Sequence, residues 1–86
     1  MRLKCDIKKD HDTFYPILIE NNKIIFISDH DIATKFGLTY EEYTKFIIQN
    51  KGYQRFDCYY FKTKEECQNF IEKIIEPRLI MEKLIK

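Results

Sequence analysis

The segment DIATKFGLTYEEYTKFII, residues 31–48, carries the sharpest local pattern in the sequence. A small residue, Ala33, stands four positions before Gly37, and the apolar residues Tyr43 and Phe46 follow that glycine at positions six and nine. A small side chain lets two helices approach closely, and glycine permits a sharp turn between them. The spacing therefore predicts two short helices that pack as a helix-turn-helix-like unit.

The flanks of this unit carry residues that begin and end helices. Two pairs have the spacing of a capping box, namely Ser28 with Asp31 and Thr39 with Glu42. In such a pair the side chains satisfy backbone N–H groups that have no partner inside the helix. Gly37 is expected to end the first helix in the left-handed conformation, and Gly52 is expected to end the second.

The residues before this unit predict antiparallel strands. Residues 2–8 alternate between charged and apolar side chains, and residues 14–19 and 24–27 are apolar, β-branched runs. Asn21 and Asn22 fit a two-residue hairpin turn, because asparagine tolerates positive φ. The register that this turn sets pairs Glu20 with Lys23, Ile19 with Ile24, Leu18 with Ile25 and Ile17 with Phe26. The face expected to be buried then carries Ile17, Ile19, Ile24 and Phe26.

The residues after Gly52 predict a strand followed by helices. Residues 53–61 are rich in aromatic side chains and predict one strand, whose alternation sends Phe56 and Tyr60 to one face and Phe61 to the other. Thr63 begins a third helix in this prediction, and Pro77 is expected to end or kink it before a last short helix. The predicted order is β-β-β-α-α-β-α-α. It corresponds to a single α+β domain over residues 1–86, with an antiparallel sheet of three to four strands.

Composition and motifs argue against several classes of function. The formal net charge is +1, with acids and bases mixed along the chain, whereas nucleic-acid binders usually show a basic excess. There is no glycine-rich phosphate loop, G-x-S-x-G or H-E-x-x-H motif, so we expect no catalytic residues, no cofactor and no enzyme activity. Cys5, Cys58 and Cys67 form no C-x-x-C pair and are expected to be small buried hydrophobes in a cytoplasmic protein. No apolar run is long enough for a membrane helix.

Two Asp-His-Asp triplets, at residues 10–12 and 29–31, are the candidates for metal binding. The hairpin register would place Asp12 opposite Asp31, where carboxylates and imidazoles could bind a divalent transition metal. The alternative explains each triplet separately, as a turn and as the first turn of a helix. The second interpretation is favoured, and no metal site is predicted.

Two surfaces are candidates for binding. Exposed tyrosines beside Arg55 are typical of protein interfaces, and they adjoin the polar face of the second helix. The predicted protein-binding residues are Glu41, Thr44, Lys45, Tyr53, Arg55 and Tyr59. In the alternative, the second helix enters a DNA groove and presents Tyr40, Thr44, Lys45 and Gln49. Glu41 and Glu42 weaken that alternative, because phosphates would repel their carboxylates.

The hairpin around residues 21–22, the segment ISDHDIATKFGLTYEEYTKFI (27–47) and the segment CYYFKTKEECQNFIEKI (58–74) also carry a resemblance. The chain resembles small proteins carried by phages and plasmids of AT-rich Gram-positive bacteria. This resemblance implies a regulator, or an inhibitor of host defence such as an anti-CRISPR protein.

The residues and the resemblance together predict a non-enzymatic protein-binding module, an inhibitor of a defence complex in the cytoplasm of the host bacterial cell. The alternative function is a small helix-turn-helix transcriptional regulator. Weak nucleic-acid binding and a homodimer both stay open at this point.

Overall fold

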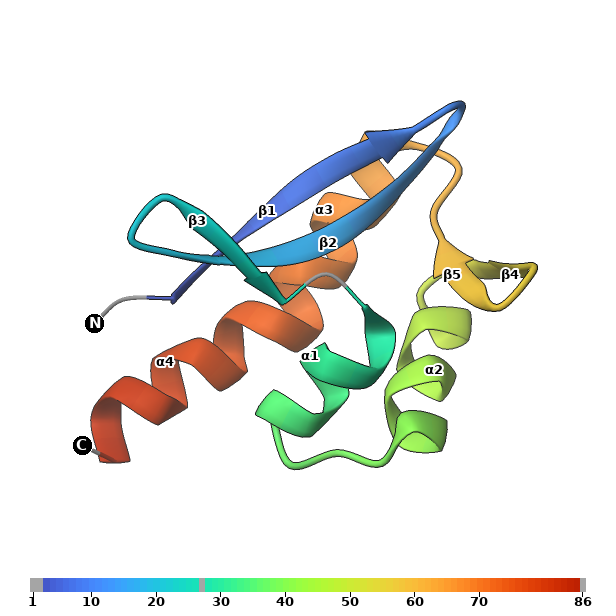
Figure 1. The fold of residues 1–86 in the computed structure, drawn as a ribbon. Coiled ribbons are helices and arrows are strands. Elements are labelled where there is room, and N and C mark those ends of the chain that lie inside the picture. Colours follow the sequence, from blue (N-terminus) through green and yellow to red (C-terminus); the bar gives the residue numbers. More distant parts are fainter. Residues whose placement is uncertain (1–2, 27, 86) are drawn as a thin grey trace.

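The computed structural model describes residues 3–26 and 28–85, with side chains as far as Met81 (Figure 1). A three-stranded antiparallel sheet, a two-stranded sheet and a set of helices make up these residues. This arrangement confirms the α+β class and the predicted order of elements. Within the described ranges, no helix has both the length and the apolar character needed to cross a membrane.

The larger sheet has the strand order β1-β2-β3, formed by β1 (Leu3–Asp10), β2 (Thr13–Glu20) and β3 (Lys23–Phe26). The helices gather on one side of it (Figure 1). Asn21 and Asn22 form the turn between β2 and β3 with φ of 53° and 64°, as predicted.

The register between β2 and β3 is only partly as predicted. Ile19 pairs with Ile24, but a bulge between Leu18 and Ile19 then places Leu18 opposite Phe26. Leu18 is fully buried, whereas Ile24 is 41% exposed, so the predicted buried face is wrong at these two positions. The bulge adds one unpaired residue and thereby turns the following side chains to the other face.

The helix pair follows the prediction closely. It consists of α1 (Asp29–Lys35) and α2 (Tyr40–Gln49), and Thr39 begins α2 with a complete capping box. The Ser28 hydroxyl accepts a hydrogen bond from the Asp31 amide at the start of α1. Gly37 has φ of 70°, and the Leu38 amide donates to the carbonyl of Ala33, which is 1% exposed.

The end of α2 differs from the prediction for Gly52. Lys51 has the left-handed conformation, with φ of 75°, and the Gly52 amide donates to the Ile47 carbonyl at 2.8 Å. Gly52 is needed for close packing instead. A Cβ atom at this position would meet the Ile47 Cγ2 atom and would lie 2.9 Å from the Ile47 carbonyl oxygen.

The predicted single strand at residues 53–61 is a hairpin. Its strands are β4 (Tyr53–Arg55) and β5 (Cys58–Tyr60), and the chain reverses at Phe56 and Asp57. The prediction of one continuous strand with two alternating faces is therefore wrong.

The side chains of this segment are correspondingly redistributed. Phe56 at the turn is 88% exposed, whereas Phe61 is fully buried. Cys58 is exposed, in contrast to the buried position predicted for it.

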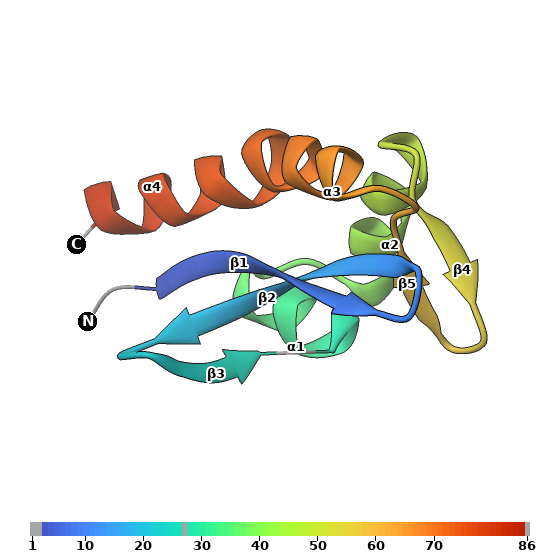
Figure 2. The same cartoon turned by 90° about the horizontal axis from the view of Figure 1, so that it is seen from above.

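The last helices run without interruption through α3 (Lys64–Phe70), a π-helical segment η1 (Ile71–Ile75) and α4 (Glu76–Ile85), as Figure 2 shows. The predicted last helix is present, but the chain does not end a helix at Pro77, which is the second residue of α4. In a regular α-helix the proline ring would clash with the carbonyl four residues earlier. The wider π turn directly before Pro77 accommodates that ring.

One hydrophobic core joins the sheet to the helices. Tyr43 of α2 and Phe61 after β5 both pack against Phe70 of α3, with ring centroids 5.9 Å and 5.1 Å apart. The buried cluster consists of Leu18, Ile32, Ala33, Tyr43, Ile47, Phe61, Cys67, Phe70, Ile71, Ile75 and Leu79. Burial raises the pKa of the Cys67 thiol to about 12, so this thiol stays protonated at neutral pH.

Candidate protein-binding surface

Two tight turns lie at the same end of the molecule in both views (Figures 1 and 2). One joins β1 to β2 through His11 and Asp12, and the other joins β4 to β5 through Phe56 and Asp57. The first residue of each turn is left-handed, with φ of 56° at His11 and 57° at Phe56. We call the six residues around these turns the tip surface: Asp10, His11, Asp12, Arg55, Phe56 and Asp57.

The two hairpins that carry the tip surface are joined by hydrogen bonds and by charge. Phe14 at the start of β2 and Phe61 after β5 exchange two backbone hydrogen bonds, of 2.9 Å and 2.7 Å. Nearer the turns, the Arg55 guanidinium lies 3.8 Å from the Asp10 carboxylate. The two turns are therefore held at one site, although they come from opposite halves of the chain.

Phe56 is the most unusual residue of this surface. Its ring is 88% exposed and lies 6.0 Å from the Arg55 guanidinium. A bulky side chain in the left-handed region is a steric outlier, and an exposed phenyl ring contributes no burial energy. Backbone strain together with an exposed ring is typical of a functional position, because folding alone would favour glycine or asparagine there.

Arg55 is held in place by the aromatic rings beneath it. Its guanidinium lies 5.0 Å from the centroid of the Tyr60 ring, and Tyr15 packs edge-on against Tyr60 at 5.7 Å. The Nε atom of Arg55 is buried and has no hydrogen-bond partner among the described residues. The arginine is therefore fixed by stacking more than by hydrogen bonds.

The base of the β4–β5 hairpin is tied to the helix pair. The Asp29 carboxylate accepts a hydrogen bond of 3.1 Å from the Tyr59 amide, and the Tyr40 hydroxyl donates to the Asp57 carbonyl at 3.5 Å. His30 stacks on Tyr40, with ring centroids 3.8 Å apart and planes 7° apart. These contacts hold the hairpin at the start of both helices.

Asp29 is a carboxylate of this region that the fold partly removes from water. Its burial raises the pKa of the carboxyl group from 3.8 to about 6, opposed in part by the Tyr59 amide and by His30. Desolvation disfavours the charged form of a carboxylate, which explains the direction of the shift. Asp29 therefore connects α1 to the hairpin, but its charged form at neutral pH lowers the stability of the fold.

Charges are unevenly distributed over this end of the molecule. The tip surface has three carboxylates and one guanidinium, a net charge of −2 with His11 neutral, whereas the whole chain has +1. The adjoining helix starts add the exposed carboxylates of Asp31, Glu41 and Glu42. The two turns and the adjoining helix starts are thus acidic around Phe56, and Lys9 and Lys62 lie behind them, over the rings of Phe14 and Tyr53.

The structure brings some of the predicted binding residues to this end. Arg55 and Tyr59 belong to the β4–β5 hairpin, and Tyr53 lies on the same hairpin beneath the Lys62 ammonium group, 5.9 Å away. Glu41 and Lys45 are exposed on α2.

Thr44 does not lie where the sequence suggested. It is 8% exposed, and its hydroxyl donates to the Glu41 carbonyl. The prediction that Thr44 is on the exposed face of α2 is therefore wrong, for the protein-binding set and for the DNA-binding set alike. Tyr40, from the same DNA-binding set, is half-buried beside the hairpin, whereas Gln49 is exposed.

The two Asp-His-Asp triplets are separate in the structure. Asp12 lies in the turn between β1 and β2, whereas Asp31 lies in the first turn of α1, so the predicted opposition of these two carboxylates is wrong. Among the side chains that the structure describes, in residues 3–26 and 28–81, no group of three or more from His, Cys, Asp or Glu could hold a metal ion.

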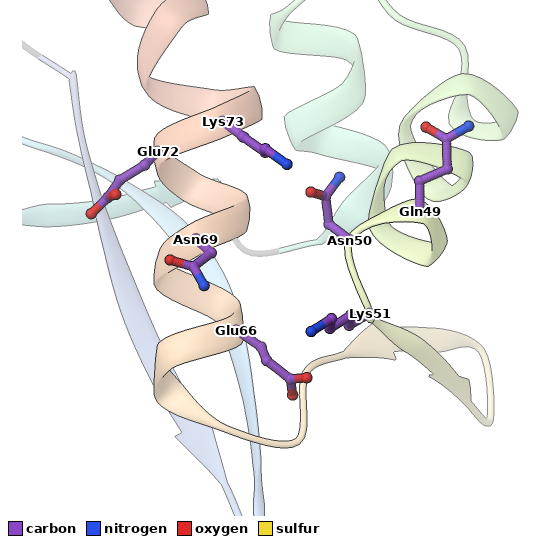
Figure 3. A pocket seen from close by; sticks show the side chains of 7 residues that line it. All are labelled: Gln49, Asn50, Lys51, Glu66, Asn69, Glu72 and Lys73. Carbon is purple, nitrogen blue, oxygen red and sulfur yellow. The ribbon is translucent and has the colours of Figure 1, made fainter.

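A pocket of about 430 Å³ lies between the end of α2 and the helix formed by α3 and η1 (Figure 3). Its walls are made of charged and carboxamide side chains, namely Gln49, Asn50, Lys51, Glu66, Asn69, Glu72 and Lys73. Pockets for small molecules are mostly apolar, with a few polar groups that orient the ligand. No aromatic or aliphatic residue lines this pocket, so its composition does not favour a small-molecule site.

Comparison with known proteins identifies no relative: no family model matches the chain, and no curated protein or solved structure matches it significantly.

The residues at the centre of this surface do not stand out in the sequence. Alternation places Phe56 in the middle of a strand, because Arg-Phe-Asp-Cys lacks the glycine or asparagine that marks a two-residue turn. A usable signal was present in the aromatic runs on both sides, since Tyr53 and Tyr60 are spaced to face each other across a short hairpin.

Proposed function

We propose that the chain is a non-enzymatic protein-binding module that works in the bacterial cytoplasm and contacts its partner through the tip surface. The observation that carries this proposal is Phe56, which is 88% exposed and left-handed at the tip of a hairpin. Aromatic side chains and arginine dominate the binding energy of protein interfaces. Phe56 beside Arg55 has that composition.

The rigidity of the hairpin supports the same proposal. Its base is bound to β2 by the Phe14–Phe61 bridge and to α1 by the Asp29 carboxylate. A surface that is already ordered loses little conformational entropy when it binds. The fold therefore presents Phe56 from a fixed base.

The class of partner proposed is a bacterial defence complex, which the module would inhibit by occupying a functional surface. This part of the proposal rests on the resemblance of residues 27–47 and 58–74 to small phage and plasmid proteins.

The test is site-specific photo-crosslinking in bacterial cells, with a photoreactive phenylalanine analogue in place of Phe56. The matched control places the same analogue at Ile80, which is 55% exposed on α4. We expect a defined protein adduct from position 56 that is absent from position 80. Identical adducts from both positions would contradict the proposal.

A DNA-binding regulator is the second candidate, because α1, Gly37 and α2 do form the predicted helix pair. The acidic start of α2 weighs against it, since the first residues of a recognition helix contact base edges between phosphates. A gel-shift assay at physiological salt separates the two functions. Sequence-specific retention that Lys45→Ala abolishes would replace the protein-binding proposal with the regulator.

A further inference from the structure

The exposed carboxylates of Asp12 and Asp57, which we call the rim of the tip surface, indicate the charge that a partner would need. Asp12 and Asp57 are exposed at the two turns, and Asp10 is half-buried beside Arg55. Within the tip surface Arg55 is the one permanent cation, and its contact with Asp10 and its stacking on Tyr60 already engage it. The free charges of the two turns themselves are therefore the carboxylates of Asp12 and Asp57, whereas Lys9 and Lys62 lie over the rings of Phe14 and Tyr53.

The exposed ring of Phe56 and the carboxylates of Asp12 and Asp57 are complementary to different features of a partner. The ring gains binding energy only when an apolar pocket removes it from water. The carboxylates gain only when cations approach them, and a rim of carboxylates disfavours an acidic partner. One surface satisfies both requirements if it has an apolar pocket edged by lysine or arginine.

We propose that the tip surface docks on a basic protein surface, with Phe56 in an apolar pocket and with Asp12 and Asp57 facing lysine or arginine side chains. This inference rests on the proposed function and narrows it to one class of partner. Because the rim charges lie in water around the anchor, they act mainly on the association rate and on the choice of partner. Phe56 supplies the anchor that slows dissociation.

A display library of random dodecapeptides tests the inference without knowledge of the partner. We expect the wild-type protein to enrich peptides in which lysine or arginine flanks apolar residues. Phe56→Ser should abolish this enrichment, whereas Ile80→Ser, at an exposed apolar position on α4, should leave it unchanged.

The charged rim is tested with the most enriched peptide. The double variant Asp12→Asn, Asp57→Asn should reduce the association rate constant about tenfold at low salt and flatten its salt dependence. The matched control is Glu65→Gln, Glu76→Gln, which neutralises two exposed carboxylates on α3 and α4. We expect its association rate to equal that of the wild type.

The outcomes separate the two proposals. Enriched peptides that depend on Phe56 but have acidic or unbiased flanks would overturn the basic-partner inference and leave the protein-binding function standing. If no enrichment depends on Phe56, both proposals fail. If the two double variants slow association equally, the rim has no special role and the inference is wrong.

Discussion

Two hairpin turns of this chain both contain residues with positive φ, but the residue types that adopt this conformation differ. Asn21 and Asn22 connect β2 to β3, and Phe56 and Asp57 connect β4 to β5, with left-handed residues in both turns. Asparagine adopts that conformation readily, whereas phenylalanine does so at a cost. The first turn is explained by folding alone. The second is where sequence and local structure disagree, and such disagreements mark functional or strained sites.

The two helices of the central unit show the same contrast at their ends. Leu38 and Gly52 donate equivalent closing hydrogen bonds, of 2.9 Å and 2.8 Å, across a left-handed residue. That residue is Gly37 after α1 but Lys51 after α2. Lys51 also lines the pocket of Figure 3, so the side chain that glycine would lack contributes to that pocket.

The largest expected effect comes from the glycine that the fold needs for space. Gly52→Ala should lower the free energy of unfolding by about 2–3 kcal/mol, because the new methyl group would overlap Ile47. Gly37→Ala should cost only about 1 kcal/mol, since its Cβ atom would meet nothing within 4 Å and only left-handed strain remains. Urea denaturation of both variants gives the comparison, and equal losses would show that Gly52 is not sterically required.

The second-largest change in stability is expected at Asp29, whose carboxylate accepts a hydrogen bond from the Tyr59 amide of the β4–β5 hairpin. The pKa of Asp29 is about 6 in the folded state, above the ordinary 3.8, so its protonation favours folding. That contribution is fully present below about pH 4 and is lost as the pH rises through 6. Asp29→Asn removes the desolvated charge and keeps an acceptor for the Tyr59 amide. We therefore expect a gain of about 2 kcal/mol at pH 7 and little change at pH 4.

Thermal unfolding from pH 4 to pH 7 measures this difference. The control is Asp12→Asn, which removes an exposed carboxylate from the turn between β1 and β2. If Asp29→Asn destabilises the protein at pH 7, the charged carboxylate is a stabilising partner of Tyr59 and the interpretation is wrong.

The two hairpin turns are compared directly by a pair of substitutions. Phe56→Gly should raise the free energy of unfolding by about 1 kcal/mol, because it relieves left-handed strain. Asn22→Ala should lower it by about 1 kcal/mol, because alanine tolerates that conformation less well than asparagine. A loss of stability in Phe56→Gly, measured by chemical denaturation, would mean that the ring supports the fold and is not kept for binding.

The smallest effect is expected at the end of α2. Lys51→Gly should stabilise the protein by about 0.5–1 kcal/mol, since glycine has no steric penalty in the left-handed region. Lys45→Gly is the matched control inside α2 and should destabilise by about 1 kcal/mol. Should Lys51→Gly prove neutral or destabilising, contacts of the Lys51 side chain in the pocket compensate for the strain.

Short-range patterns in the sequence were enough to predict most element boundaries. Thr39 with Glu42 begins α2, Gly37 ends α1, and Asn21 with Asn22 reverses the chain, all as expected. Each of these outcomes depends on hydrogen bonds or φ angles within a few residues. Neighbouring residues alone therefore decide them.

Tertiary contacts decided the rest. The turn at Phe56 lacks the glycine or asparagine that marks a two-residue turn, and it is held by the pairing of Phe61 with Phe14 and by the hydrogen bond from the Tyr59 amide to Asp29. Thr44, Cys58 and the bulge at Leu18 depend likewise on what packs against each element. Local sequence patterns were enough to predict most of the elements, their order and most of their caps, but not the β4–β5 hairpin. Only the tertiary structure brought the two turns of the tip surface together, because pairing between distant segments leaves no periodic trace in either segment.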